Sequence, residues 1–324
     1  MKRFHNLDFL RALAMMMGLV IHAPLIFWSP DFAKVYGIDN VAPAQEWINI
    51  LGRFISSWRM PLFFLLSGFF AILVIERKGI SQFLRDRIIR VGLTCLIFSS
   101  LYDISDGSFD FTTLHLWFLF ELMIIVLVFS LLYRLKMIKK LISMKLTPKI
   151  FFFLTLWLIS SVPLAFILNN WWHPLALKAS TSYFDLKIGN MLYYFSYFLV
   201  GVILYFNQKI FIKLKNIKTI FLLGNLSLFA FLLRIYSDHL TIGQADSLRN
   251  IAQIQFDPIL VFFNACMIGI NSILWCLLFI GLASKIIHSD NLIIRWLVEL
   301  SYPIYIIHII PVTMMSAVFH HAGL

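Results

Sequence analysis

Three ionisable side chains stand inside an apolar stretch near the start of the chain. The stretch LDFLRALAMMMGLVIHAPLIFW, residues 7–28, is long enough to cross a bilayer, yet it holds Asp8, Arg11 and His22. On an α-helix, Arg11 and His22 would share one face about 16 Å apart, with Asp8 one turn before Arg11. Ionisable groups at membrane depth are costly and commonly line a site or pathway. Because its ordinary pKa suits proton transfer near neutral pH, His22 is the candidate catalytic base, with Arg11 and Asp8 as supporting residues.

Plainer roles remain open for the same residues. Asp8 and Arg11 could form an ordinary ion pair near a helix end. A lone imidazole within a membrane could simply bridge two helices. Asp8 would lie about 21 Å from His22 along the helix, too far to orient that imidazole directly.

A second group of candidates is spread over the rest of the chain. These residues lie at the expected outer ends of spans or within the last span, and they are Arg59, His115, Trp117, Glu121 and His308. Trp117 could anchor the protein at the interface or stack on a sugar ring. Glu121 could act as a second acid or base, or neutralise a buried cation. His308 follows Tyr305 by one turn, and an interhelical hydrogen bond is the simpler explanation for that pair.

The elements that must position these residues are predicted to be membrane-spanning helices. Of the 324 residues, 60% are hydrophobic and only 13% are charged, which is too apolar for a soluble domain of this size. We expect an all-α polytopic bundle forming one domain over residues 1–324. The nine predicted spans are 7–28, 59–76, 89–104, 114–133, 150–168, 188–206, 219–236, 257–283 and 303–319. Residues 44–58 have the pattern of an interfacial amphipathic helix.

The distribution of positive charge predicts the orientation of the bundle. Lys and Arg gather before the first span, at Lys2 and Arg3, and in the alternate loops near 77–90, 134–149, 209–218 and 285–295. Residues 103–112, between two such loops, contain three aspartates and neither Lys nor Arg. The positive-inside rule therefore places the N-terminus in the cytoplasm. The net charge of +11 is largely explained by this topology, so nucleic acid is not an expected partner.

The cysteines and the N-terminus suggest no further chemistry. Cys95, Cys266 and Cys276 all fall in apolar segments and lack the spacing of a metal site, so we expect no metal and no tightly bound cofactor. The basic and then apolar N-terminus lacks a small-residue cleavage site and carries Asp8 and Arg11. It therefore reads as a retained first span.

Several motifs, taken in order, resemble those of a known family. LDFLRALAMMMGLVIH looks like the first helix of the acyltransferase type 3 family of integral membrane proteins. That helix carries an arginine followed, after ten intervening residues, by a histidine. Arg11 and His22 have that spacing. The later matching segments are WRMPLFFLLSGFF at 58–70, RIIR at 87–90, HLWFL at 115–119 and LSYPIYIIH at 300–308. The residues around Arg59 and the HLWFL segment are similar to those of a succinyltransferase-like branch of the family.

The resemblance implies a bacterial inner-membrane enzyme that transfers an acyl group. Acetyl or succinyl would pass from cytoplasmic acyl-CoA, a co-substrate, to a hydroxyl of an extracytoplasmic glycan or glycolipid. Arg87, Arg90 and Arg11 would bind the polyanionic CoA, although Arg87 and Arg90 could equally be topology-setting charges. His22 would either deprotonate the acceptor or carry the acyl group itself.

The sequence also departs from the family pattern. The family usually has ten spans, whereas nine are predicted here. Some branches of the family have a glutamate at the position of Leu122. Glu121 is one residue away from that position, so we do not assign to it the role of the family glutamate. Two other functions remain open. Asp8, Arg11, His22 and Glu121 could form the proton relay of a transporter or flippase. The absent tenth span would suit a non-catalytic family member that binds partners in the membrane.

Overall fold

The computed structural model consists of helices joined by loops. It describes residues 4–39, 44–105, 107, 111–138, 141, 143–171, 177–242, 256–288 and 291–322. Lys2 and Arg3 lie outside these residues. Within them, the β-structure is limited to an isolated bridge between Thr112 and Ser182. The predicted all-α class is confirmed.

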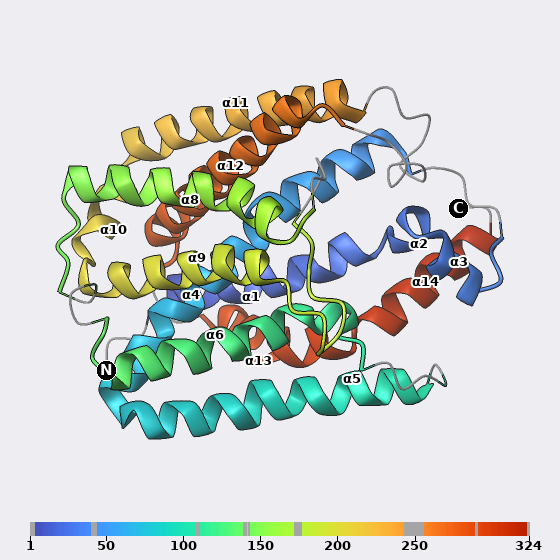
Figure 1. The fold of residues 1–324 in the computed structure, drawn as a ribbon, viewed down its shortest axis with the longest axis horizontal. Coiled ribbons are helices and arrows are strands. Elements are labelled where there is room, and N and C mark those ends of the chain that lie inside the picture. Colours follow the sequence, from blue (N-terminus) through green and yellow to red (C-terminus); the bar gives the residue numbers. More distant parts are fainter. Residues whose placement is uncertain are drawn as a thin grey trace. The chain divides into compact units, whose positions relative to one another are not determined.

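The helices fall into two compact units of the chain, Met1–Phe63 with Lys213–Leu324, and Phe64–Ile212. In chain order (Figure 1) the elements are α1 (His5–His22), α2 (Leu25–Trp28), α3 (Pro30–Val35), α4 (Glu46–Arg87), η1 (Ile88–Leu93), α5 (Thr94–Ser105), η2 (Leu114–Leu116), α6 (Trp117–Arg134), α8 (Pro148–Leu168), α9 (Ile188–Phe206), α10 (Lys209–Leu214), α11 (Ile217–Ile242), α12 (Pro258–Ile286), α13 (Leu292–Ile307) and α14 (Ile309–His321).

Several helices can cross a membrane. The long apolar segments are Glu46–Ile104, Leu114–Arg134, Pro148–Leu168, Ile188–Phe206, Ile217–Thr241 and Pro258–Ile286. The pair α13 and α14, bent by 70°, would make a seventh span. These segments fit a multi-pass membrane protein, but they do not confirm the count of nine. Two predicted spans merge in Glu46–Ile104, which turns at Gly79 (φ +79°), and α1 is less apolar because of its polar residues.

The course of α4 changes the expected position of Arg59. The helix runs without a break from Glu46 past residue 58, so residues 44–58 are not a separate interfacial helix. Arg59 lies about 20 Å from the start of α4 along its axis. Its side chain is only 5% exposed. Arg59 is therefore a buried residue within a continuous helix rather than the first residue of one.

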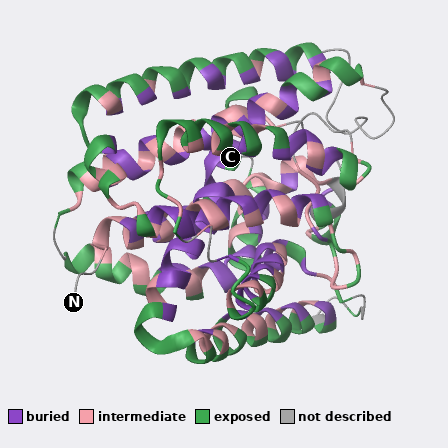
Figure 2. Cartoon of the chain, turned by 60° about the vertical axis from the view of Figure 1, so that its left-hand side comes forward, coloured by how far each residue is buried: buried purple, intermediate pink, exposed green. Residues whose placement is uncertain are grey.

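In the first unit, α1 is held between helices from the other end of the chain. It packs on α13, α12 and α14, and α11 lies alongside α12 (Figure 1). Individual helices have a buried and an exposed side (Figure 2). On α11 the exposed side is apolar, including Phe221, Leu222 and Phe229. Such a surface suits contact with lipid.

In the second unit, two glycines bring backbones together. A Cβ at Gly68 in α4 would overlap the carbonyl oxygen of Phe198 in α9. A Cβ at Gly201 in α9 would overlap the carbonyl oxygen of Leu65 in α4. Membrane helices approach most closely where small residues meet. The serine-glycine-phenylalanine segment at residues 67–69 therefore provides a helix-packing contact.

Candidate active site

His22 and His308 form the centre of the candidate site. His22 is the last residue of α1, and His308 stands at the bend between α13 and α14. Their ring planes are nearly parallel, at 10°, with centroids 5.0 Å apart, and Nδ1 of His22 lies 2.7 Å from Nε2 of His308. His308 is only 2% exposed. The structure thus joins two histidines that are 286 residues apart in the sequence.

Hydrogen bonding determines which ring nitrogens carry protons. Nδ1 of His308 contacts the backbone carbonyl of Tyr305 at hydrogen-bonding distance. A carbonyl only accepts, so Nδ1 of His308 must be the donor. In a neutral ring, Nε2 of His308 is then the acceptor, and Nδ1 of His22 donates to it. A neutral His22 consequently carries its basic lone pair on Nε2.

The bend after α13 makes this arrangement possible. Carbonyls in the last turn of a helix lack partners within that helix, and Tyr305 lies in the last turn of α13. Hydrogen bonds tie α14 to the N-terminal segment: Ser316 Oγ donates to the Ala23 carbonyl over 2.7 Å, and the Tyr36 hydroxyl lies 2.7 Å from Thr313 Oγ1. These contacts hold the middle of α14 close to the residues that follow α1.

Arg59 belongs to the same cluster, which the sequence did not reveal. Its guanidinium is hydrogen-bonded to the Tyr305 hydroxyl and is close enough to act electrostatically on His308. Gly18, one turn before His22 on α1, provides the necessary space. A Cβ there would overlap the Tyr305 ring and lie 2.7 Å from Nη1 of Arg59. The sequence signal for Gly18 was only a glycine four residues before the motif histidine.

Asp8 and Arg11 lie away from this cluster. The unbroken helix α1 separates Arg11 from His22 by about 16 Å. Nη2 of Arg11 is 3.1 Å from Oδ1 of Asp8, and the side chains are 31% and 14% exposed respectively. The structure therefore contains the ion pair that the plainer interpretation predicted.

Arg87 and Arg90 are found at a change of helix type. Arg87 ends α4 and lies over the Phe83 ring, with 5.4 Å from Cζ to the ring centroid. Arg90 is exposed and lies in the π-helical turn η1. A π-turn holds more residues than an α-turn, so the two arginines are not one regular turn apart. Short π-helical segments often occur at functional sites.

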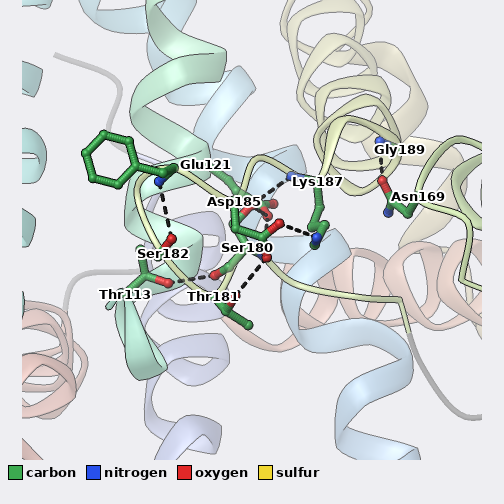
Figure 3. Close-up of polar contacts among 10 residues, drawn as sticks. Thr113, Glu121, Asn169, Ser180, Thr181, Ser182, Asp185, Lys187 and Gly189 are labelled. Carbon is green, nitrogen blue, oxygen red and sulfur yellow. Dashed lines mark hydrogen bonds and ion pairs between the residues drawn. The ribbon is translucent and has the colours of Figure 1, made fainter. Parts of the chain in front are cut away.

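Glu121 anchors a loop rather than lying open to a substrate. Its carboxylate is completely buried. It accepts two hydrogen bonds of 2.9 Å from Asn190 Nδ2, one to each oxygen, and one of 2.9 Å from Ser180 Oγ. Thr113 Oγ1 donates to the Ser180 carbonyl over 2.6 Å (Figure 3). These contacts tie the loop before α9 to the start of α6.

The neighbouring candidates and the loop itself are also packed. His115 is 7% exposed and lies edge-on to Tyr102, with ring centroids 5.4 Å apart. Trp117 is half-buried against Tyr194, with centroids 5.8 Å apart. In the loop, a hydrogen bond from Lys187 lowers the pKa of the half-buried Asp185 (Figure 3). Because Trp117 packs against Tyr194, its ring is less available for stacking on a sugar than its position in the sequence suggested.

A mainly apolar cavity lies beside the last turn of α1. Its volume is about 330 Å³. Ile21 and Ala23, on either side of His22, line it together with Trp28, Trp47 and Phe319. A cavity of this size and composition suits a hydrocarbon group.

Comparison with known proteins identifies the family. The family model described as an acyltransferase domain, type 3, matches residues 4–324. Glucans biosynthesis protein C of Escherichia coli (strain K12) is 32% identical over 95 residues, which are 29% of this chain and 23% of that protein. The corresponding protein of Escherichia coli O1:K1 / APEC is 30% identical over the same shares.

The match to these relatives therefore spans about a quarter of their length. No solved structure matches the chain significantly. The family match, in contrast, runs through nearly the whole sequence and agrees with the all-helical, multi-pass fold. The chain belongs to the type 3 acyltransferase family of membrane proteins.

Proposed function

We propose that this protein is a membrane O-acyltransferase that moves an acetyl or succinyl group from cytoplasmic acyl-CoA to a hydroxyl of an extracytoplasmic glycan or glycolipid. The family supports acyl transfer, and the name of the partial relative, glucans biosynthesis protein C, supports a glycan acceptor. The charge pattern of the loops supports a bacterial inner-membrane location with the N-terminus in the cytoplasm.

The observation that carries the proposal is the contact between His22 and His308. With Nδ1 donating to His308, His22 can use Nε2 to accept the proton of an acceptor hydroxyl. The hydroxyl oxygen then attacks the thioester carbonyl, and the CoA thiolate leaves with the proton that His22 returns. His308 resembles in function the third member of a catalytic triad, because it orients the base.

Acyl-CoA and the acceptor would approach from opposite sides of the membrane. Arg87 and Arg90 in the second unit, and separately Arg11 in the first, are the candidates for binding the phosphates of CoA, because a guanidinium group suits phosphate through planar, bidentate hydrogen bonding. The apolar cavity lined by Ile21 and Ala23 favours an acceptor that carries a hydrocarbon part, and thus a glycolipid over a free glycan. Asp8 would hold Arg11 in place through their ion pair. His115, Trp117 and Glu121, all in the second unit, are proposed as accessory residues.

Reconstitution tests this proposal. Proteoliposomes containing the wild-type protein would be given acetyl-CoA or succinyl-CoA labelled in the acyl group, with a crude glycan and glycolipid extract. We expect label to enter the extract, and we expect the double variant Arg87→Ala, Arg90→Ala to raise the apparent KM for acyl-CoA. The rise should grow with salt, since exposed charge contacts are screened.

Other outcomes would overturn the proposal. If acyl-CoA does not bind and proton-coupled flux of a solute appears, the protein is a transporter. If neither transfer nor flux occurs in folded protein, it is a non-catalytic family member. Lys78, which pairs with Asp86 over 3.6 Å in the same part of the chain, provides a matched control. Lys78→Ala should leave the KM for acyl-CoA close to that of the wild type.

A further inference from the structure

We propose that Arg59 is the electrophilic group of the site, holding the oxyanion that forms on the thioester carbonyl during acyl transfer. This assignment rests on the proposed function and adds to it the component that an acyltransferase needs beyond a base. Negative charge develops on the carbonyl oxygen in the transition state. Preorganised donors at that position commonly provide a large share of the rate enhancement.

Arg59 has donors available for such an oxygen. Its side chain is 5% exposed, and neither Nε nor Nη1 has a hydrogen-bond partner among the residues that the structure describes. The hydrogen bond to Tyr305 therefore occupies only part of the guanidinium. A buried cation with unused donors is costly unless an anion or a strong acceptor meets it. The geometry thus points to a partner supplied by the substrate.

The position of Arg59 relates it to the proposed base. Nη1 lies against Gly18, where it would be 2.7 Å from a Cβ. Gly18 and His22 are four residues apart on α1 and so lie on the same face. Tyr305 links the groups, because its hydroxyl meets Arg59 and its ring centroid is 6.4 Å from that of His22. A carbonyl bound along this face of α1 would have the base at one end and the guanidinium at the other.

The contrast with two other arginines strengthens the assignment. Arg53, also on α4, has a protein carboxylate: Nε is 3.5 Å from Oδ2 of Asp238. Arg234 shares that carboxylate at 4.0 Å. Arg59 has no acidic partner within ion-pair distance among the described residues. Of these arginines, only Arg59 combines deep burial with proximity to the histidine pair.

The reaction balances with these groups. The acceptor oxygen forms a bond to the carbonyl carbon as its proton passes to Nε2 of His22, and the carbonyl π electrons move to the oxygen facing Arg59. The oxyanion then restores the double bond, the carbon–sulfur bond breaks, and the thiolate takes the proton from His22. Arg59 stays protonated throughout, as an arginine does in proteins.

Substitution with chemical rescue tests the role. In the reconstituted assay, Arg59→Gln and Arg59→Ala should lower kcat by about 10²–10³-fold with acetyl-CoA and with succinyl-CoA alike, with little change in KM. Added methylguanidinium should restore part of the activity of Arg59→Ala, which would also show that the variant is folded. Arg53→Gln is the matched control on the same helix, and its kcat should remain close to the wild-type value.

Three results would overturn the assignment. One is an unchanged kcat in both Arg59 variants. Another is a loss confined to succinyl-CoA and expressed as a higher KM, because Arg59 would then bind the carboxylate of the acyl group. The third is inactive variants that methylguanidinium does not rescue. Failure of the proposed function itself is distinguishable, since the wild-type protein would then transfer no label from either donor.

Discussion

At the scale of single residues, the central feature is a histidine whose orientation is fixed by a second histidine. His308 can accept from His22 only because its other nitrogen donates to the Tyr305 carbonyl. The sequence predicted His22 from its place in an apolar helix. It presented His308 as an accessory candidate, with an ordinary interhelical hydrogen bond as the simpler explanation. Spacing within one helix is readable from sequence, whereas the meeting of α1 with α13 and α14 depends on tertiary packing.

Gly18 gives a prediction at this scale. Gly18→Ala should strongly reduce acyl transfer and destabilise the protein by about 1–3 kcal/mol, because the new methyl group would displace Tyr305 and Arg59. Activity and thermal unfolding in detergent would be measured together. Gly224→Ala is the control, since a Cβ on Gly224 of α11 meets nothing within 4 Å. It should keep full activity and gain up to about 1 kcal/mol of stability. Equal behaviour of both variants would contradict the packing described.

At the scale of elements, buried contacts determine where loops and helices lie. Glu121 was predicted as an acid, a base or the partner of a cation. In the structure it accepts hydrogen bonds from Asn190 and Ser180 and so holds the loop before α9. The sequence could not show this, because the loop reaches Glu121 from 59 residues away. A buried carboxylate looks the same in sequence whether it performs chemistry or supports a loop.

Glu121→Gln separates these two roles. An amide has only one acceptor oxygen, so one hydrogen bond from Asn190 or Ser180 would be lost. We expect a loss of about 1–3 kcal/mol in stability, with kcat per folded molecule near the wild-type value. Thermal unfolding and transfer rates would be compared. A stable protein with a kcat reduced by orders of magnitude would instead make Glu121 a catalytic acid or base.

The close approach of α4 and α9 gives a second prediction for elements. Gly68→Ala and Gly201→Ala should each lower thermal stability, because each added methyl group meets a backbone carbonyl that cannot move independently. Gly92→Ala is a suitable control in the same unit, since its nearest neighbour is the flexible side chain of Met123 at 3.4 Å. If Gly68→Ala and Gly92→Ala unfold at the same temperature, α4 and α9 are not in backbone contact.

At the scale of the whole molecule, composition and loop charges were the informative signals. They predicted an all-α multi-pass protein, which the structure and the family match confirm. The number of spans was less accessible. Hydropathy detects apolar runs but not whether a helix continues between them, as α4 does from Glu46 through Arg59. The polar residues of α1 also lower its hydropathy. By hydropathy alone, this helix, which carries a candidate site, resembles a helix on the surface of a soluble protein.

The orientation of the chain is a prediction for the whole molecule. Positive-inside charge places the region of Gln82 in the cytoplasm and the loop containing Phe184 outside. Both side chains are exposed. In a background lacking the three native cysteines, Phe184→Cys should react with an impermeant maleimide on intact cells. Gln82→Cys should react only after lysis. The opposite labelling would reverse the topology and place His22 toward the cytoplasm.

Catalysis at the proposed site depends most on His22 and His308 acting as one unit. The direct test is a double-mutant cycle on acyl transfer with His22→Ala, His308→Ala and the double variant, each verified as folded. If His308 acts by orienting His22, His22→Ala and the double variant should have nearly the same kcat, with His308→Ala reduced by about 10²–10⁴-fold. Losses that multiply in the double variant, or a His22→Ala protein as active as the wild type, would contradict the account.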